Sequence, residues 1–90
     1  MVKDQRLLQE RIVREPGILA GKPTIRGTRI PVDLILAKLA YNPDLNELFA
    51  DYPHLTEEDV KACLEFAKEA VVREERNRSA ATSLAGHATL

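Results

Sequence analysis

The fold of this 90-residue chain is decided by the stretch Gly21-Lys22-Pro23-Thr24-Ile25-Arg26-Gly27-Thr28-Arg29-Ile30-Pro31-Val32. Pro23 fixes its own φ and keeps the residue before it out of the helical region, so that the chain enters residues 24–26 extended. Gly27 ends this strand at a point where a bend is easily made. Pro31 holds Ile30 extended and suits the first position of a helix. The stretch therefore predicts a short strand, a bend and the start of a helix.

The residues before this stretch predict a short β-arm. Residues 11–14 form an apolar pair flanked by arginines and read as a strand, and Glu15-Pro16-Gly17 suits a type II turn. The strands near Val13 and Ile25 can pair with each other or with the same strands of a second copy. Because the arm carries more large apolar side chains than one short hairpin can cover, we expect a homodimer built on it. The expected dimer contacts are Ile12, Val13, Ile18 and Ile25.

The residues after the stretch predict three helices. The first covers residues 31–41. Asn42 follows it and suits the left-handed position at the end of a helix. The second is capped by Asp44, and the third by Thr56 with Asp59 as the reciprocal partner at the third helical position. The apolar residues at helical spacing in the third helix predict its buried stripe, which consists of Val60, Cys63, Leu64, Ala67 and Val71.

These elements predict a mainly α fold: a three-helix homeodomain-like helix-turn-helix domain preceded by a short β-arm or hairpin. The arm and the helices form a single domain over residues 11–75, with a flexible N-terminus at residues 1–10. Residues 76–90 are small and polar without a period, so we expect a disordered tail. An apolar content of 44% suffices for a single core with little to spare, which favours dimerisation.

The net charge of −1 conceals an asymmetry along the chain. Residues 1–30 carry seven Lys or Arg and three Asp or Glu, whereas residues 31–72 carry three and nine. The basic charge therefore sits on the arm and the acidic charge on the helices. The single cysteine fits a reducing cytoplasm, and the absence of any long apolar window predicts no membrane partner. The absence of tryptophan argues against a base-stacking platform for single strands.

Three strings resemble a known family. They are Ile12-Val13-Arg14-Glu15-Pro16-Gly17, then the stretch Gly21 to Val32 quoted above, then Asp51-Tyr52-Pro53-His54-Leu55-Thr56-Glu57-Glu58-Asp59-Val60. Together they are similar to the "domain of unknown function 433" family, whose members are often described as VapB-type antitoxins. The resemblance covers about residues 11–72. It implies a small homeodomain-like domain whose partner is a PIN-like ribonuclease encoded by a neighbouring gene.

No catalytic residue, metal ligand or cofactor site is expected. Gly21-Lys22 does not fit a phosphate-binding loop, because Gly17 is one residue too close and Pro23 stands where that motif needs Ser or Thr. Cys63 lies on the apolar stripe and is better explained as a core residue than as a nucleophile. His54 lies in a turn and is better explained as a turn residue than as a ligand.

Binding to DNA is open at this point. The third helix would face the major groove, but its first turn is acidic and repels phosphates. Contacts with DNA or with a protein partner must therefore come from the arm, and the expected residues are Arg11, Arg14, Lys22, Arg26, Thr28 and Arg29. For Thr28 and Arg29 a structural role is equally plausible, with Thr28 capping a bend and Arg29 pairing with an acid on the first two helices.

We thus expect a non-enzymatic, antitoxin-like module that binds and neutralises a PIN-like endoribonuclease toxin as a dimer. The alternative is a helix-turn-helix transcriptional regulator that binds double-stranded DNA, which can coexist with the first role.

Overall fold

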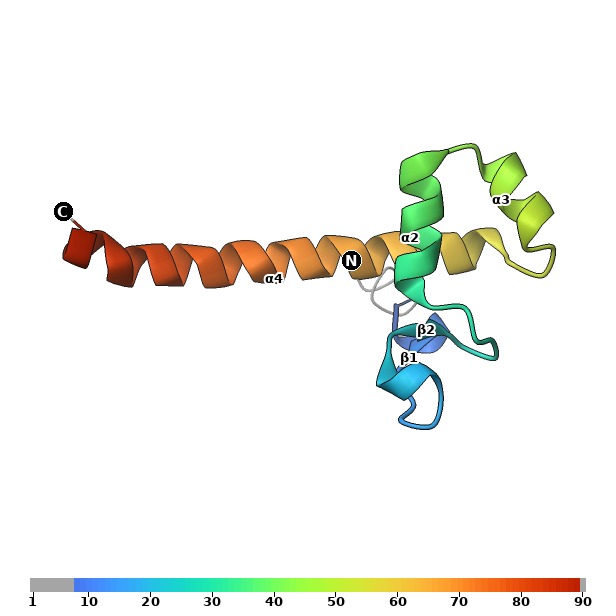
Figure 1. The fold of residues 1–90 in the computed structure, drawn as a ribbon, viewed down its shortest axis with the longest axis horizontal. Helices are drawn as coiled ribbons and strands as arrows, with labels where there is room; N and C mark the ends of the chain where they lie inside the picture. The colour runs from blue at the N-terminus through green and yellow to red at the C-terminus, as the bar shows by residue number, and fades with distance from the viewer. Residues whose placement is uncertain (1–7, 90) are drawn as a thin grey trace.

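The computed structural model describes the backbone of residues 8–89 and the side chains of residues 8–79. It is mainly helical, with one two-stranded antiparallel sheet near the N-terminus (Figure 1). One helical turn at residues 8–11 comes first. It is followed by β1 (Ile12–Val13), the 3-10 helix η1 (Leu19–Gly21), β2 (Thr24–Ile25), α2 (Val32–Tyr41), α3 (Leu45–Asp51) and α4 (Glu57–Thr89).

The β-arm folds back on itself within one chain. β1 pairs with β2 in an antiparallel register that places Ile12 opposite Ile25 and Val13 opposite Thr24. The other edge of β2 is covered by the chain returning after the bend, since the Ile25 N–H donates to the Ile30 carbonyl over 3.0 Å. Gly27 has a φ of +80° in this bend, a conformation that glycine adopts without strain. The predicted strand and bend are therefore both present.

The loop between the strands differs from the expected turn. Its first bend closes between the Ile18 N–H and the Glu15 carbonyl over 2.9 Å, but Gly17 does not have the positive φ that a type II turn requires. The predicted turn type is wrong. Positive φ occurs instead at Leu19, Ala20 and Gly21. Two consecutive non-glycine residues in this region are unusual, because Cβ then crowds the following carbonyl.

The starts of α3 and α4 follow the predicted caps, whereas the end of α2 does not. The Asn46 N–H donates to the Asp44 carboxylate over 2.9 Å at the start of α3. At the start of α4, Thr56 and Asp59 exchange two hydrogen bonds of 3.1 Å, the reciprocal capping that their spacing predicts. Asn42 is extended, with a φ of −148°, so the left-handed end residue predicted for α2 is wrong. Its side chain accepts a hydrogen bond from the Asp44 N–H instead.

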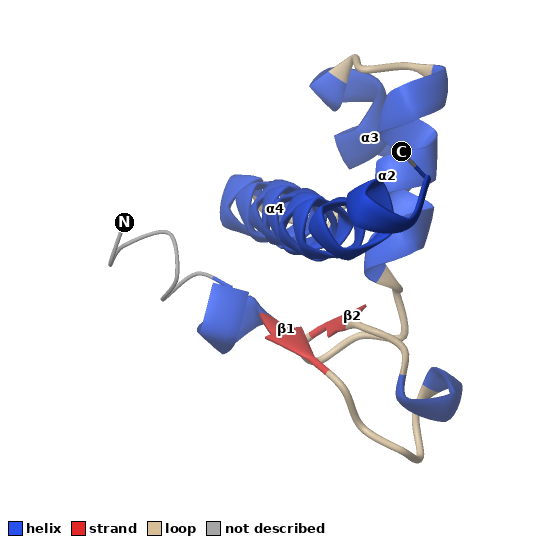
Figure 2. Ribbon diagram, turned by 90° about the vertical axis from the view of Figure 1, so that its left-hand side faces the viewer, coloured by secondary structure: helices blue, strands red, loops and turns tan. Residues whose placement is uncertain are grey.

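The core lies where α2, α3, β2 and the first part of α4 meet. α2 crosses α4, and the hairpin lies on the side of α4 away from α3 (Figures 1 and 2). The side chains of Ile35 and Cys63 are fully buried. The buried core residues are Ile25, Val32, Ile35, Leu48, Leu55, Val60 and Cys63.

The stripe predicted for α4 is only partly buried. Val60 and Cys63 lie in the core, but Leu64 is 50% exposed and Val71 is 61% exposed. The side of α4 that faces the core continues instead through Phe66, which packs against the core cluster. The prediction fails for Leu64 and Val71 because α4 carries two apolar stripes, and no other described element of the chain covers the second.

α4 also continues through the segment for which we expected disorder. The helix reaches Thr89, and residues 71–79 are all exposed. This half of α4 projects away from the rest of the fold (Figure 1). No proline or glycine interrupts residues 57–85, and Arg78 pairs with Glu74 over 3.4 Å along the helix surface.

Candidate interaction surfaces

Arg11, an expected contact residue, joins the arm to the start of α4. Its Nη1 atom lies 3.0 Å from Asp59 Oδ1 and 3.5 Å from Thr56 Oγ1. Asp59 is 8% exposed, and its second carboxylate oxygen accepts the hydrogen bond from the Thr56 N–H. The guanidinium therefore compensates a carboxylate that folding largely removes from water. Arg11 has a structural partner within its own chain.

Arg14 and Arg26 also bind back to the arm. Arg14 donates to the Gly21 carbonyl over 3.5 Å, and its guanidinium carbon lies 5.9 Å from the centre of the Phe66 ring. Arg26 donates to the backbone carbonyls of Glu10 and Gln9. Both side chains stay at the surface, so their charge is available to a partner, but their positions are fixed by backbone acceptors.

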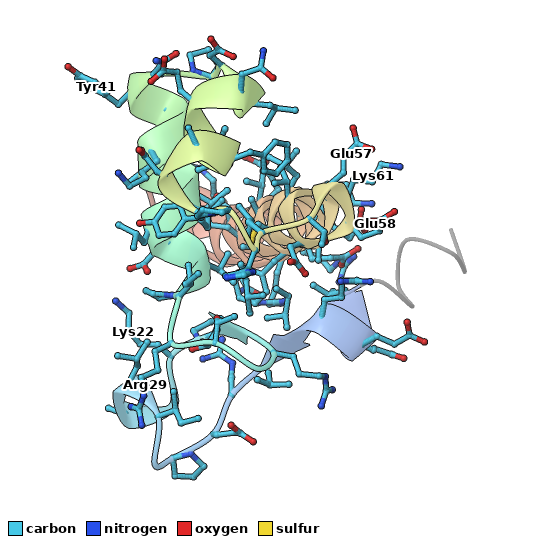
Figure 3. All side chains as sticks on the ribbon, turned by 90° about the vertical axis from the view of Figure 1, so that its right-hand side faces the viewer. Lys22, Arg29, Tyr41, Glu57, Glu58 and Lys61 are labelled. Atoms are coloured by element: carbon cyan, nitrogen blue, oxygen red, sulfur yellow. The ribbon has the colours of Figure 1, made fainter. Side chains whose placement is uncertain are left out.

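Lys22, Thr28 and Arg29 differ in how they are held. Lys22 Nζ lies 2.9 Å from Asp33 Oδ2, and this hydrogen bond holds the pKa of the Asp33 carboxyl below its ordinary value. Thr28 Oγ1 donates to the Ile25 carbonyl over 2.7 Å and accepts from the Ile30 N–H over 2.9 Å, so Thr28 stabilises the bend. Arg29 is exposed and contacts no acid among the described residues. Lys22 and Arg29 lie at the same end of the arm (Figure 3).

The four expected dimer contacts are largely used inside the chain. Ile25 is 2% exposed. Its side chain packs in the core of its own chain, and its place in a dimer contact stays a prediction. Ile12 packs against the core and is half-buried, as are Val13 and Ile18.

A groove of about 360 Å³ between α2 and α3 was not anticipated from the sequence. Lys38 of α2 and Asp51 of α3 lie across it, 3.6 Å apart, and Lys38 also stands 5.6 Å from the centre of the Tyr52 ring. Tyr41 at the end of α2 is 92% exposed beside the groove (Figure 3). No local signal predicts this groove, because it depends on how the two helices cross.

The outer face of α4 is a second surface missed by the sequence analysis. Leu64, Val71 and Val72 are exposed on it, and Val72 is 40% exposed. Lys68 lies among them and contacts Glu65 over 2.6 Å within the helix. In the view along α4, α2 and α3 lie on one side and the hairpin below, whereas Lys61 points to the open side (Figure 3). The spacing of the apolar residues was the available signal, but it was read as a core stripe.

The groups with catalytic potential are weakly placed for chemistry. The Cys63 thiol is fully buried, and burial, with the nearby Asp59 charge, raises its pKa to about 12. It is therefore a neutral thiol near pH 7 and a poor nucleophile. Among the residues that the structure describes, no group of three or more His, Cys, Asp or Glu is placed to hold a metal ion. None of the described helices is long and apolar enough to cross a membrane.

The comparisons with known proteins agree on one family. The model of the family described as "Protein of unknown function (DUF433)" matches residues 12–67. A crystal structure of a DUF433 member protein from Anabaena variabilis ATCC 29413 has a TM-score of 0.65 and 33% sequence identity, over 84% of this chain and 75% of that chain. No curated protein sequence matches the chain. The chain belongs to the DUF433 family, as the strings around the Gly21–Val32 stretch indicated.

Proposed function

We propose that this protein is a non-enzymatic, antitoxin-like module that acts as a dimer and neutralises a PIN-like endoribonuclease. The observation that carries the proposal is the projecting half of α4, where three exposed arginines lie within six residues: Arg73, Arg76 and Arg78. Nucleases of this kind cleave RNA with metal ions that carboxylates hold. Guanidinium groups pair strongly with carboxylates, so a basic helix can block such a site.

The position of this segment suits insertion into a partner. Residues 71–79 are all exposed, so a partner can bind them without disturbing the core. An amphipathic helix in a groove is a recurring mode of peptide recognition. The arm holds Arg11, Arg14 and Arg26 in contacts within the chain. On α4, Arg78 likewise pairs with Glu74, which leaves Arg73 and Arg76 without an acid contact among the described residues.

The test is inhibition of the PIN-like nuclease encoded beside this protein's gene. The variant Arg73→Ala/Arg76→Ala/Arg78→Ala is compared with the matched arm variant Lys22→Ala/Arg26→Ala/Arg29→Ala, each titrated against RNA cleavage. We expect the α4 variant to inhibit at least about tenfold more weakly, since it loses charge-assisted hydrogen bonds, and the arm variant to inhibit like the native chain. Equal inhibition by the α4 variant and the native chain would refute the assignment of the inhibitory surface to α4.

A second candidate function is binding to DNA as a homeodomain-like helix-turn-helix protein. It is favoured by the short connection between α3 and α4 and by the exposed pair Lys22 and Arg29 at one end of the arm. The acidic first turn of α4, with exposed Glu57 and Glu58, opposes it.

The salt dependence of binding to a promoter fragment separates the two surfaces. If DNA binds through the arm, Lys22→Ala/Arg29→Ala lowers the slope of log K against log salt by about two, because two phosphate contacts are lost. Glu57→Ala/Glu58→Ala then strengthens binding by removing repulsion. A fragment that neither pair of substitutions affects is not held by this protein in the proposed way.

A further inference from the structure

The two halves of α4 differ in how they are supported. Residues 57–70 pack against α2 and the core, whereas residues 71–79 are all exposed. A helical segment of this length is marginal by itself in water, because nucleation is costly and only packing offsets it. Among the residues that the structure describes, the projecting half therefore lacks the packing that normally stabilises a helix.

One face of α4 runs through both halves. Leu64, Lys68, Val71 and Glu75 are separated by three or four residues and so share this face, with Val72 at its edge. Leu64, Val71 and Val72 are all at least 40% exposed. Lys61, three residues before Leu64 on the same side of the helix, points to the side that α2, α3 and the hairpin leave open (Figure 3).

The charges on this face are arranged symmetrically about its two valines. Lys68 lies three residues before Val71, and Glu75 lies three residues after Val72. Lys68 contacts acids of its own helix, yet its side chain remains 55% exposed and can reach a partner. In an antiparallel pair of α4 helices centred between the valines, each Lys68 faces the Glu75 of the other copy. In a parallel pair in register, like charges would face each other.

We propose that this face binds α4 of a second copy of the chain in an antiparallel pair centred on Val71 and Val72. The antiparallel arrangement places the projecting half of each α4 on the half of the other that the core supports, so each helix supplies the packing that the other lacks. It leaves Arg73 and Arg76 outside the contact, because they lie two and five residues beyond Val71 and point elsewhere, whereas Arg78, seven residues beyond Val71, lies on the contact face. This inference rests on the dimer of the proposed function and names its surface.

Sedimentation equilibrium of the full chain alone tests the proposal with a charge swap. Lys68→Glu replaces two attractions with two repulsions and should weaken association about tenfold, and Glu75→Lys should do the same. The double variant Lys68→Glu/Glu75→Lys should restore association to within about threefold of the native chain. Lost pairing within one helix cannot explain such a restoration, since residues seven apart on a helix do not contact each other.

The direction of the pair is tested by oxidation of single-cysteine substitutions. Val72→Cys lies near the two-fold axis and should form a covalent dimer, whereas Leu64→Cys lies far from its counterpart in an antiparallel pair and should not. The native Cys63 is buried and does not compete. Circular dichroism shows whether each variant keeps its fold.

The proposal is overturned if the native chain is monomeric at about 100 μM, a concentration on the order of that at which weak pairs associate. It is also overturned if the double swap fails to restore association, or if Leu64→Cys forms a crosslink. Loss of association in the arm variant Ile18→Glu, with none in the charge-swap singles, would place the dimer on the arm instead. Because the nuclease is absent from these measurements, their outcome is independent of whether the chain inhibits it.

Discussion

The ion pair between Arg11 and Asp59 provides a quantitative test of how the arm is attached to the helices. It joins positions 48 residues apart over 3.0 Å, and the side chain of Asp59 is 11% exposed while that of Arg11 is 37% exposed. The pair therefore lies between the surface class, whose members contribute at most about 1 kcal/mol, and the buried class, where removal of one partner costs about 3–5 kcal/mol.

Asp59→Ala removes two contributions. One is the capping hydrogen bond to the Thr56 N–H, which is worth about 1 kcal/mol. The other is the pairing with Arg11, which we place at about 1–2 kcal/mol because the guanidinium is half-exposed. The free energy of unfolding should fall by about 2–3 kcal/mol, which lowers Tm on the order of 10 °C in a domain of this size.

A double-mutant cycle with Arg11→Met and Asp59→Asn isolates the pair, since asparagine keeps an oxygen that can accept from the Thr56 N–H. Urea unfolding should give a coupling of about 1 kcal/mol. The same cycle on Lys22 and Asp33, an exposed pair, is the matched control and should show a clearly smaller coupling. A coupling for Arg11 and Asp59 no larger than that of the control would refute the reasoning that burial makes this contact important.

Three further predictions follow from the described contacts. Cys63 should be inert to a thiol reagent at pH 8 in the folded protein and react fully in denaturant, because its pKa is raised to about 12 by burial; rapid labelling of the native state would contradict this. Gly27→Ala should lower the free energy of unfolding by about 1–2 kcal/mol, since alanine is strained at its φ of +80°, whereas the matched Gly17→Ala should be neutral or slightly stabilising, as urea unfolding can show. The pKa of Asp33, followed by NMR, should rise in the variant Lys22→Ala. Because the pKa of Asp33 is lowered in the folded state, the stabilisation by this pair is present above the ordinary carboxyl pKa and is lost as the pH falls through the folded-state pKa.

The features that sequence reasoning predicted correctly are local ones. The caps at Asp44 and Thr56, the bend at Gly27 and the start of α2 within one residue of Pro31 each depend on residues a few positions apart. Their conformational preferences act before any tertiary contact forms. Asn42 shows the limit even here, because its side chain binds the Asp44 N–H and so favours an extended backbone over the left-handed one.

The candidate site was harder to predict because charge alone does not identify a partner. The sequence correctly indicated that the arm is basic, but Arg11 pairs with an acid 48 residues away. The sequence also suggested that Arg29 pairs with an acid on the first two helices, whereas Lys22 makes such a pair, with Asp33 of α2. Both pairings depend on the packing of the arm against the helices. Of the two residues in the bend, Thr28 stabilises the bend through its hydroxyl group. Arg29 has no acid partner among the described contacts.

The failure of the α4 stripe has a different cause. Helical spacing identified Leu64 and Val71 as apolar residues that belong to an interface, and only the choice of interface was wrong for the single chain. A period of 3.6 residues carries no information about whether the covering surface comes from the same chain or from another copy. If the antiparallel pair forms, both residues become buried, together with Val72. The stripe read from the sequence then describes two contacts of one helix, the first made with its own core through Val60 and Cys63 and the second with its counterpart.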